Sequence, residues 1–409
     1  MNFWKTFPDK DELLDWYSLN GDSKTRLVNA HMHTPFSFSA FAEISDALDR
    51  SVNENVKVVG INDFYTTDGY TEWAEGCEKR KIFPLFNIEL ISLNRADQAA
   101  GIKVNDPNNP GRTYLSGKGL AFPPKLDEPY ASTLESVKIE SNLQVQQMCA
   151  KLNEVLAGYN AGFQLDFEEI KATLTKGMVR ERHLAKALRE KIVAQFPSEE
   201  GQQEFYKTVF GGKSLKSAIG NFAAIENEIR GNLLKAGGAA FIPESPEAFL
   251  DMEMVCQIIL NAGGIPTYPF LADDNNGNFT DFEGDKVTAL KVLRERNIWS
   301  IELIPTRNSL AVVEDYVVYF SKNGMVVTLG SEHNTPAMEP IELFARNSTP
   351  LSKKVLDINY EGACITAAHQ YLVATEGSGY LDKNGRPDQT QKKNFVTLGK
   401  ALIEYLTRN

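Results

Sequence analysis

The hydrophobic positions near the start of the chain form continuous runs separated by an amphipathic segment. Residues 26–31 (RLVNAH), 56–63 (VKVVGIND) and 82–93 (IFPLFNIELISL) have the β-branched and aromatic character of strands, while 41–55 has apolar residues at helical spacing. Continuously apolar strands are typical of parallel sheets that are covered on both faces. The pattern therefore predicts the first strands of a parallel α/β sheet.

The same alternation returns in the second half of the chain. A helix is predicted first, because Ser245 can cap it, Pro246 fits its first turn and two glycines follow it. Strands are predicted at 265–270, 298–305 and 325–334, and helices at 245–264, 285–297 and 311–324. Six strands separated by helices favour a barrel or a doubly wound sheet.

The two halves are separated by a long stretch of different character. Residues 95–131 contain many turn residues and little periodicity, as expected of a long functional loop or flap. Apolar residues then recur at steps of three and four in segments 133–160, 166–175, 180–196 and 214–237. We therefore divide the chain into a first part of the barrel (1–94), an inserted loop and helical subdomain (95–244), a second part of the barrel (245–340) and a helical C-terminal extension (341–409).

Size and charge limit the possible partners. With 409 residues, 42% of them hydrophobic, the chain can bury a large core. Its formal net charge of -11 would repel a phosphate backbone, so we expect no extended nucleic-acid surface. A small anionic substrate remains possible where metal ions supply a positive field.

The chain also lacks the signals of export. We find no basic segment followed by an apolar one at its start and no apolar run as long as a membrane span, so we expect a cytoplasmic protein with no membrane partner. Four widely spaced cysteines indicate reduced thiols rather than disulfides or a thiolate zinc cluster. The oligomeric state stays open.

Two histidines one residue apart, His31 and His33, lie at the carboxyl end of the first predicted strand. Side chains two apart on a strand point the same way, so both imidazoles would face one point, which suits a divalent metal ion. A single His-x-His also fits two histidines that are merely hydrogen-bonded. Acidic residues end the other predicted strands, whose carboxyl ends share one face in parallel α/β folds; they are Asp63, Glu89, Glu302 and Glu332, the last followed by His333.

The order of these motifs resembles the polymerase and histidinol phosphatase (PHP) superfamily of metal-dependent phosphoesterases, in the branch with a helical insertion. Members carry His-x-His-Thr, Thr-Asp-His, Gly-x-Glu, Arg-Pro-His, Ala-His-Pro and a final Gly-Ser-Asp-x-His. Here AHMHT matches the first motif and NIEL the third, VRERHLAKAL resembles the fourth through Arg182 and His183, and LGSEHN resembles the last. The similarity covers about residues 26–340. His369 lies outside the motifs, and we expect a hydrogen-bonded helix histidine there.

The resemblance implies an irregular, seven-stranded, TIM-like (β/α) barrel that hydrolyses a small phosphorylated metabolite with metal-activated water. The metal ligands would be His31, His33, Asp63, Glu89, His183, Glu332 and His333. Asp63 could alternatively accept a proton from the water, which makes it a catalytic candidate together with Arg182. Arg182 and Arg307 are the candidates for binding the substrate's anionic group, since a guanidinium recognises phosphate oxygens in a bidentate manner.

Two departures from the family pattern limit the number of ions. Phe64 stands where the second motif has histidine, and GGIPTYPFLAD offers only Phe270 or Tyr268 at the fifth. We therefore expect one or two divalent ions, of zinc, manganese or iron, rather than three. Two alternatives to a phosphoesterase remain. One is a catalytically decayed ligand-binding or regulatory protein, and the other is a metal-dependent isomerase, lyase or amidohydrolase.

Overall fold

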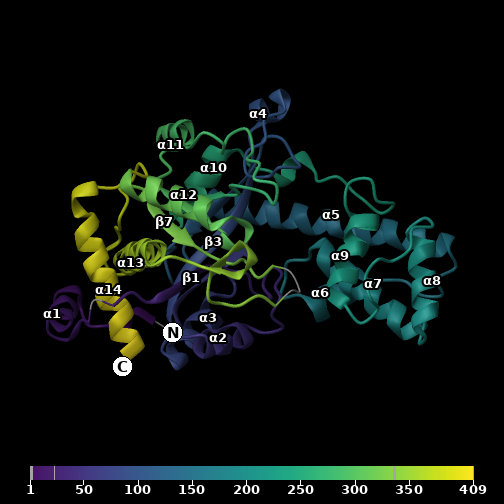
Figure 1. Ribbon diagram of the computed structural model, residues 1–409, viewed down its shortest axis with the longest axis horizontal. Helices are drawn as coiled ribbons and strands as arrows, with labels where there is room; N and C mark the ends of the chain where they lie inside the picture. The colour runs from purple at the N-terminus through teal and green to yellow at the C-terminus, as the bar shows by residue number, and fades with distance from the viewer. Residues whose placement is uncertain (1–2, 23, 335–337, 409) are drawn as a thin grey trace.

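A seven-stranded sheet forms the centre of the computed structural model, which describes residues 3–22, 24–334 and 338–408 (Figure 1). Its strands follow one another in chain order around the sheet: β1 (Leu27–Met32), β2 (Val56–Phe64), β3 (Phe83–Leu93), β4 (Arg112–Lys118), β5 (Ile265–Phe270), β6 (Ser300–Leu303) and β7 (Val326–Leu329). Neighbouring strands are parallel except around β4, which runs antiparallel to both β3 and β5.

The sheet nearly closes into a barrel where the chain beyond β7 meets β1. Met32 and Glu332 form a parallel bridge, the Glu332 amide donates to the His31 carbonyl (2.9 Å), and the His33 amide donates to the Glu332 carbonyl (2.8 Å). Gly330 makes this approach possible, because a Cβ there would lie 2.2 Å from the Cβ of His31. The predicted TIM-like barrel of seven strands is therefore confirmed.

Helices surround the barrel, as the alternating pattern predicts. They are α2 (Ile44–Asn53), α3 (Tyr70–Arg80), α10 (Met252–Asn261), α11 (Lys286–Glu295) and α12 (Leu310–Lys322). α2, α3, α10 and α12 pack against strands of the sheet. In α2 the buried residues Ile44, Ala47 and Leu48 recur at steps of three and one, on one side of the helix.

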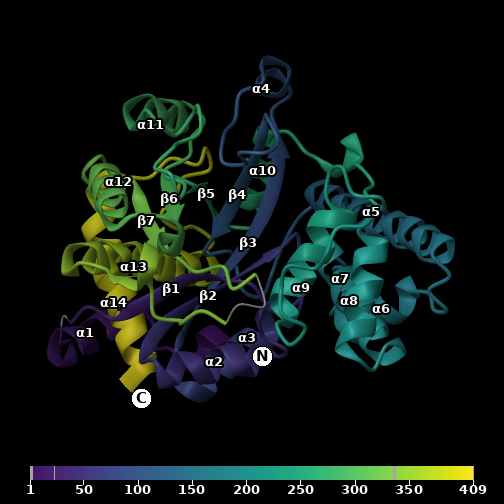
Figure 2. The ribbon, with the colours of Figure 1, turned by 45° about the vertical axis from the view of Figure 1, so that its right-hand side comes forward.

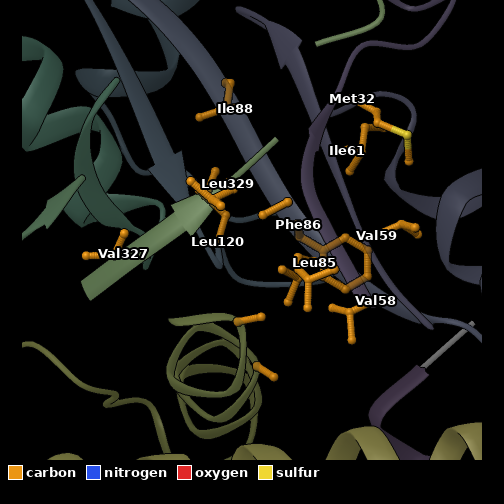
Figure 3. Close-up of a cluster of buried hydrophobic side chains, with 14 of the residues drawn as sticks. Met32, Val58, Val59, Ile61, Leu85, Phe86, Ile88, Leu120, Val327 and Leu329 are labelled. Carbon is orange, nitrogen blue, oxygen red and sulfur yellow. The ribbon is translucent and has the colours of Figure 1, made fainter. Parts of the chain in front are cut away.

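The barrel strands carry both apolar and polar buried side chains. Apolar side chains, including Met32, Val58 and Leu329, gather in the cluster drawn in Figure 3, beside the yellow-green helix α13 (Lys353–Glu376). Polar side chains contact one another across the barrel: the Asn62 amide donates to Ser116 (3.2 Å), and Lys118 donates to Asn62 (3.3 Å). The barrel therefore has a polar interior, in which charged groups can be held.

The segment 95–131, which we expected to be a loop, contains regular structure. It holds the short helix α4 (Arg95–Ala100) and the barrel strand β4. β4 has no apolar run because its sequence, RTYLSGK, places Ser116 and Lys118 in the polar interior and a glycine between them. A Cβ on Gly117 would lie 2.9 Å from Ile259 of α10, so this glycine allows the helix to pack closely on the strand.

The helices of the predicted insertion lie together on one side of the barrel, drawn in teal in Figures 1 and 2. They are α5 (Tyr130–Gly158), α6 (Phe167–Leu174), α7 (Glu181–Gln195), α8 (Glu199–Val209) and α9 (Phe222–Ile229), which continues into a π-helical turn at Arg230–Leu234. They enclose a hydrophobic cluster of their own, with Leu152, Leu188 and Tyr206 almost fully buried. α9 begins eight residues later than the predicted segment at 214.

The C-terminal part contains two long helices. α13 packs against β1, β3 and β7, and α14 (Lys392–Arg408) packs against α13 and against α1 (Lys10–Asn20). His369 lies in α13, where its Nε2 hydrogen-bonds the Gly263 carbonyl (2.7 Å) and its Nδ1 accepts from the Tyr380 amide (2.8 Å), which confirms its expected role. A small two-stranded sheet, β8 (Phe344–Ala345) and β9 (Thr349–Pro350), precedes α13. Within the described ranges, no helix combines the length and hydropathy needed to cross a membrane.

Candidate metal centre

His31, His33 and Glu89 converge in the interior of the barrel. His31 belongs to β1, His33 follows it directly, and Glu89 lies on β3. The Nε2 atoms of the two imidazoles are 3.4 Å apart, and Oε2 of Glu89 lies 3.6 Å from that of His31 and 3.2 Å from that of His33. All three side chains are buried. These three residues, which we call the metal triad, form the only such group in the described part of the chain.

The metal triad fits a divalent cation. Tetrahedral zinc with bonds of about 2.1 Å holds its donor atoms roughly 3.4 Å apart, close to all three distances of the triad. Oε2 of Glu89 is buried and has no hydrogen-bond partner among the described residues. An unsatisfied buried carboxylate oxygen is costly, and a cation would satisfy it. Two imidazoles and a carboxylate suit zinc, manganese or iron.

Two phenylalanine rings fix the orientation of His33. Its imidazole stacks on Phe38 (centroids 4.9 Å apart, interplanar angle 19°) and on Phe64 (5.3 Å, 6°). Phe64 is the last residue of β2 and pairs in register with Glu89. A phenyl ring cannot coordinate a metal, so at this position the protein has a packing contact in place of a fourth ligand.

The second ring nitrogen of His31 contacts a buried carboxylate. Its Nδ1 lies 2.7 Å from Oε2 of Glu302 on β6, and Oε1 of Glu302 lies 2.6 Å from the ammonium of Lys118. Burial opposes protonation of His31, but the charge and hydrogen bond of Glu302 outweigh it and raise the pKa of His31 to about 9. Burial alone would raise the pKa of Glu89. The hydrogen bonds and charges of both imidazoles outweigh burial and lower the pKa of Glu89 to about 2. The site therefore favours positive charge beside an ionised Glu89.

Asp63 lies outside the metal triad. Its oxygens accept hydrogen bonds from the Thr34 amide (2.7 Å), the Thr34 hydroxyl (2.5 Å) and the Ser37 hydroxyl (2.5 Å). The carboxylate thus anchors the turn that follows β1, which carries Phe38. With both oxygens engaged in this way, Asp63 acts here as a structural anchor, and the structure does not bring it to the metal position expected from the sequence.

Glu332 and His333 also have partners other than the metal triad. Both have positive φ angles, and the Glu332 carboxylate contacts the Arg307 guanidinium and the Asn334 amide. His333 stacks on Phe41, its Nδ1 hydrogen-bonds Ser331 (2.6 Å), and its Nε2 hydrogen-bonds the Glu339 carbonyl (2.9 Å). Glu332 lines the same cavity as Glu89, but neither Glu332 nor His333 is part of the metal triad.

His183 lies in the first turn of α7 and is likewise separate from the metal triad. Its Nδ1 accepts a hydrogen bond from the Arg180 amide (2.9 Å), so it caps the helix. The side chain lines a different cavity, between the insertion and the turn after β1. Burial lowers the pKa of His183 to about 4, so that it is neutral near pH 7.

A cavity of about 270 Å³ lies between the metal triad and the insertion, with Glu89 in its wall. Five cationic side chains line it: Arg180, Arg182, Arg230, Lys235 and Arg307. Three of these have a carboxylate partner: Glu181 contacts Arg230 (2.8 Å) and Lys235 (3.3 Å), and Glu332 contacts Arg307.

Arg180 and Arg182 have no carboxylate within salt-bridge distance in the described ranges. Arg180 donates to Ser141 (3.0 Å) and lies over the ring of Phe64, 5.4 Å from its centroid. Arg182 lies 5.7 Å from the centroid of Phe38. Burial, followed by the charge of Arg230, lowers the pKa of Arg182 to about 10. Neither guanidinium has a salt bridge in the described ranges, and both line the cavity whose wall includes Glu89. Guanidiniums in such a position can recognise an anionic group.

Several residues of the site were not assigned by the sequence. Arg180 lies two positions before Arg182, within the stretch VRERHLAKAL, and only the structure shows that it lacks a salt-bridge partner in the described ranges. Lys118 lies in the stretch expected to be a loop, and Glu302 was recognised as the end of a strand without a role. In the sequence, β4 is visible only as a short run between turn residues, in which a lysine follows a serine by two positions.

The fold of the chain is similar to that of two solved structures with low sequence identity. A candidate metal-dependent phosphoesterase from Bifidobacterium adolescentis is 15% identical; the match covers 82% of this chain and 95% of that one, with a TM-score of 0.51. An amidohydrolase from Chromobacterium violaceum, solved with bound sulfate and no metal, is 16% identical; the match covers 81% and 96%, also with a TM-score of 0.51. No protein-family model matches the sequence, and no curated protein matches it significantly. At these identities the likeness shows a common fold.

Proposed function

We propose that this protein is a metal-dependent hydrolase of the PHP type, a phosphoesterase that acts on a small phosphorylated metabolite. One observation carries the proposal: a cavity whose wall includes Glu89 of the metal triad also presents the guanidiniums of Arg180 and Arg182, neither of which forms a salt bridge in the described ranges. A cation site next to an anion site is what phosphoester hydrolysis requires. The order of the sequence motifs and the names of the two structural neighbours are consistent with it.

His31, His33 and Glu89 would hold one divalent cation. When bound, such a cation supplies Lewis-acid polarisation and makes water a better nucleophile near neutral pH. Phe64 takes the place of a further histidine, and Lys118 already neutralises Glu302, so the residues present favour a single ion over two.

The arginines would bind and orient the substrate. Arg180 and Arg182 have the planar donors that recognise the non-bridging oxygens of a phosphoryl group, and their charge would also stabilise the negative charge that develops during displacement. Phe38 and Phe64 lie against these guanidiniums and exclude water from one side of His33. Arg307 would complete the anion site only after releasing Glu332, so we assign it a secondary role in binding.

Metal content and phosphatase activity test the proposal together. Protein purified without chelator should contain about one zinc, manganese or iron per chain, and should hydrolyse p-nitrophenyl phosphate or a member of a panel of phosphorylated metabolites when manganese is added. His33→Ala should lose both the metal and the activity, while His369→Gln, in α13, should keep both at pH 7.5.

Two outcomes would contradict the enzyme assignment. Protein that binds no metal even with zinc or manganese in excess would exclude the cation site. Protein that binds metal but hydrolyses neither esters nor amides would support the ligand-binding or regulatory alternative. Hydrolysis of amides without hydrolysis of phosphoesters would support the amidohydrolase alternative, in which the arginine pair binds a carboxylate.

A further inference from the structure

The interior of the barrel contains a buried ion pair that does not line the cavity. Lys118, on β4, and Glu302, on β6, are 1% and 0% exposed, and Nζ lies 2.6 Å from Oε1. The ammonium also donates to the Ala30 carbonyl (3.2 Å) and to Oδ1 of Asn62 (3.3 Å). All the groups around Nζ are therefore acceptors, as a buried ammonium needs.

The other oxygen of Glu302 determines which nitrogen of His31 is free to bind a metal. Oε2 lies 2.7 Å from Nδ1, so the proton of His31 that faces Glu302 stays on Nδ1. Nε2 is then the nitrogen left to bind a cation, and it faces His33 and Glu89. The amide nitrogen of Asn62 lies 2.9 Å from Nε2, so a bound cation would replace this contact. Carboxylates that accept the second N–H of a ligating histidine fix its ring and increase its basicity.

We propose that Lys118 and Glu302 are positioning residues of the metal triad: Glu302 fixes the ring of His31, and Lys118 fixes Glu302 and compensates its charge. The inference rests on the cation site proposed above. If Lys118 were absent, the two carboxylates of Glu302 and Glu89 would together neutralise the charge of a divalent cation. With Lys118 present, the loaded site has an excess of one positive charge, which favours an anionic substrate.

A buried ion pair can also be only a part of the core, and the two roles are separable. Replacing a buried pair by apolar side chains of similar volume is often neutral or stabilising for folding. The double variant Lys118→Met/Glu302→Met should therefore fold. If the pair positions His31, zinc affinity should fall about 10-fold to 100-fold, as is typical when the carboxylate partner of a ligating histidine is lost.

The experiment measures zinc affinity by competition with a chromogenic chelator, alongside thermal unfolding of the metal-free protein. The matched control is Arg189→Met/Glu226→Met in the insertion, which removes an ion pair of 2.8 Å whose two residues are each 9% exposed. Its zinc affinity should stay within twofold of that of the unaltered protein.

A second readout reports on the imidazole itself. Histidine-selective ¹⁵N labelling of the zinc-loaded protein should show His31 with a proton on Nδ1 and none on Nε2. In Glu302→Gln, a neutral side chain replaces the carboxylate, so the Nδ1 proton should exchange faster with water. A purely structural ion pair would leave this signal unchanged.

The outcomes distinguish the two proposals. If the unaltered protein binds no zinc, the cation site itself is wrong. If it binds zinc and the double variant binds it within twofold, the positioning role is wrong while the cation site stands. If His31 of the zinc-loaded protein carries its proton on Nε2, that nitrogen is not a ligand, and both the positioning role and the assignment of His31 to the cation site are wrong. If the double variant does not fold, Glu302→Gln still decides through its zinc affinity, which should fall, and through the Nδ1 signal.

Discussion

The rings of His33 and Phe64 lie nearly parallel, with centroids 5.3 Å apart and an interplanar angle of 6°. Phe64 is 4% exposed and also contacts the guanidinium of Arg180. One side chain thus links a metal ligand to a residue of the anion site. At this position the protein has a stacking contact, where the motif that the sequence resembles has a histidine.

Phe64→Leu should weaken both sites while keeping an apolar core. Loss of the aromatic contacts should lower the free energy of unfolding by about 1 kcal/mol, measured by urea denaturation. Zinc affinity should fall several-fold because His33 gains freedom to rotate. A substitution that leaves zinc affinity and the KM for a phosphoester unchanged would show that the stacking has no functional part.

Arg180→Met/Arg182→Met should separate binding from stability. Burial lowers the pKa of Arg182, whereas the charge of Glu181 outweighs burial and raises the pKa of Arg180. The two removals should therefore have opposing effects and change the free energy of unfolding little. The KM for a phosphoester should rise about 10-fold or more, since each charge-assisted hydrogen bond contributes about 1.5 to 3 kcal/mol. Arg80→Met, which removes an ion pair with Asp49 on the surface, is the control and should leave KM unchanged.

Gly330→Ala should disrupt the closure of the barrel. The added Cβ would lie 2.2 Å from the Cβ of His31, so either β7 or His31 must move. We expect a loss of about 1 to 3 kcal/mol of stability, typical of overpacking, together with weaker zinc binding. Gly158→Ala is the matched control, because a Cβ at the end of α5 would meet no atom within 4 Å. Equal effects of the two substitutions on zinc affinity would contradict the role given to Gly330.

His369 should make the protein less stable in acid. Burial lowers the pKa of His369 to about 4 from its ordinary value of 6.5. Between these pH values the unfolded chain binds a proton at this residue and the folded protein does not, so stability falls as the pH falls from about 6.5 to about 4. The full effect is about 3 kcal/mol.

Urea denaturation of His369→Gln at pH 7 and pH 5 measures this effect. The substitution removes one titrating group, so the loss of stability between the two pH values should be smaller than in the unaltered protein. His183 titrates in the same direction and should keep part of the dependence. An unchanged difference between pH 7 and pH 5 would show that His369 is not the group responsible.

The alternation of strands and helices could be predicted from the hydrophobic runs, because strands that are covered by helices must carry apolar side chains. β4 could not, since its inward side chains are polar and its sequence has no apolar run. The polar interior of the barrel could not be predicted either. Its residues Asn62 and Asn87 stand singly within runs that otherwise appear continuously apolar.

His31 and His33 could be identified because strand ends in a parallel fold meet at one face. Glu89 ends the apolar run FPLFNIE but lies within β3 (Phe83–Leu93), which continues for four more residues. His183 matched a family motif, yet its Nδ1 caps α7, a contact that sequence similarity does not reveal. The pairing of Lys118 with Glu302 depends on closure of the barrel, which brings together residues far apart in the chain. Long-range pairing of this kind leaves no local pattern.

The antiparallel direction of β4 has a consequence for how this protein can diverge. Because β4 runs against its neighbours, Lys118 enters from the opposite end of the barrel to the loops that surround the cavity, and it does not line that cavity. Substitutions in those loops can therefore change which molecules bind in the cavity without altering the ion pair between Lys118 and Glu302.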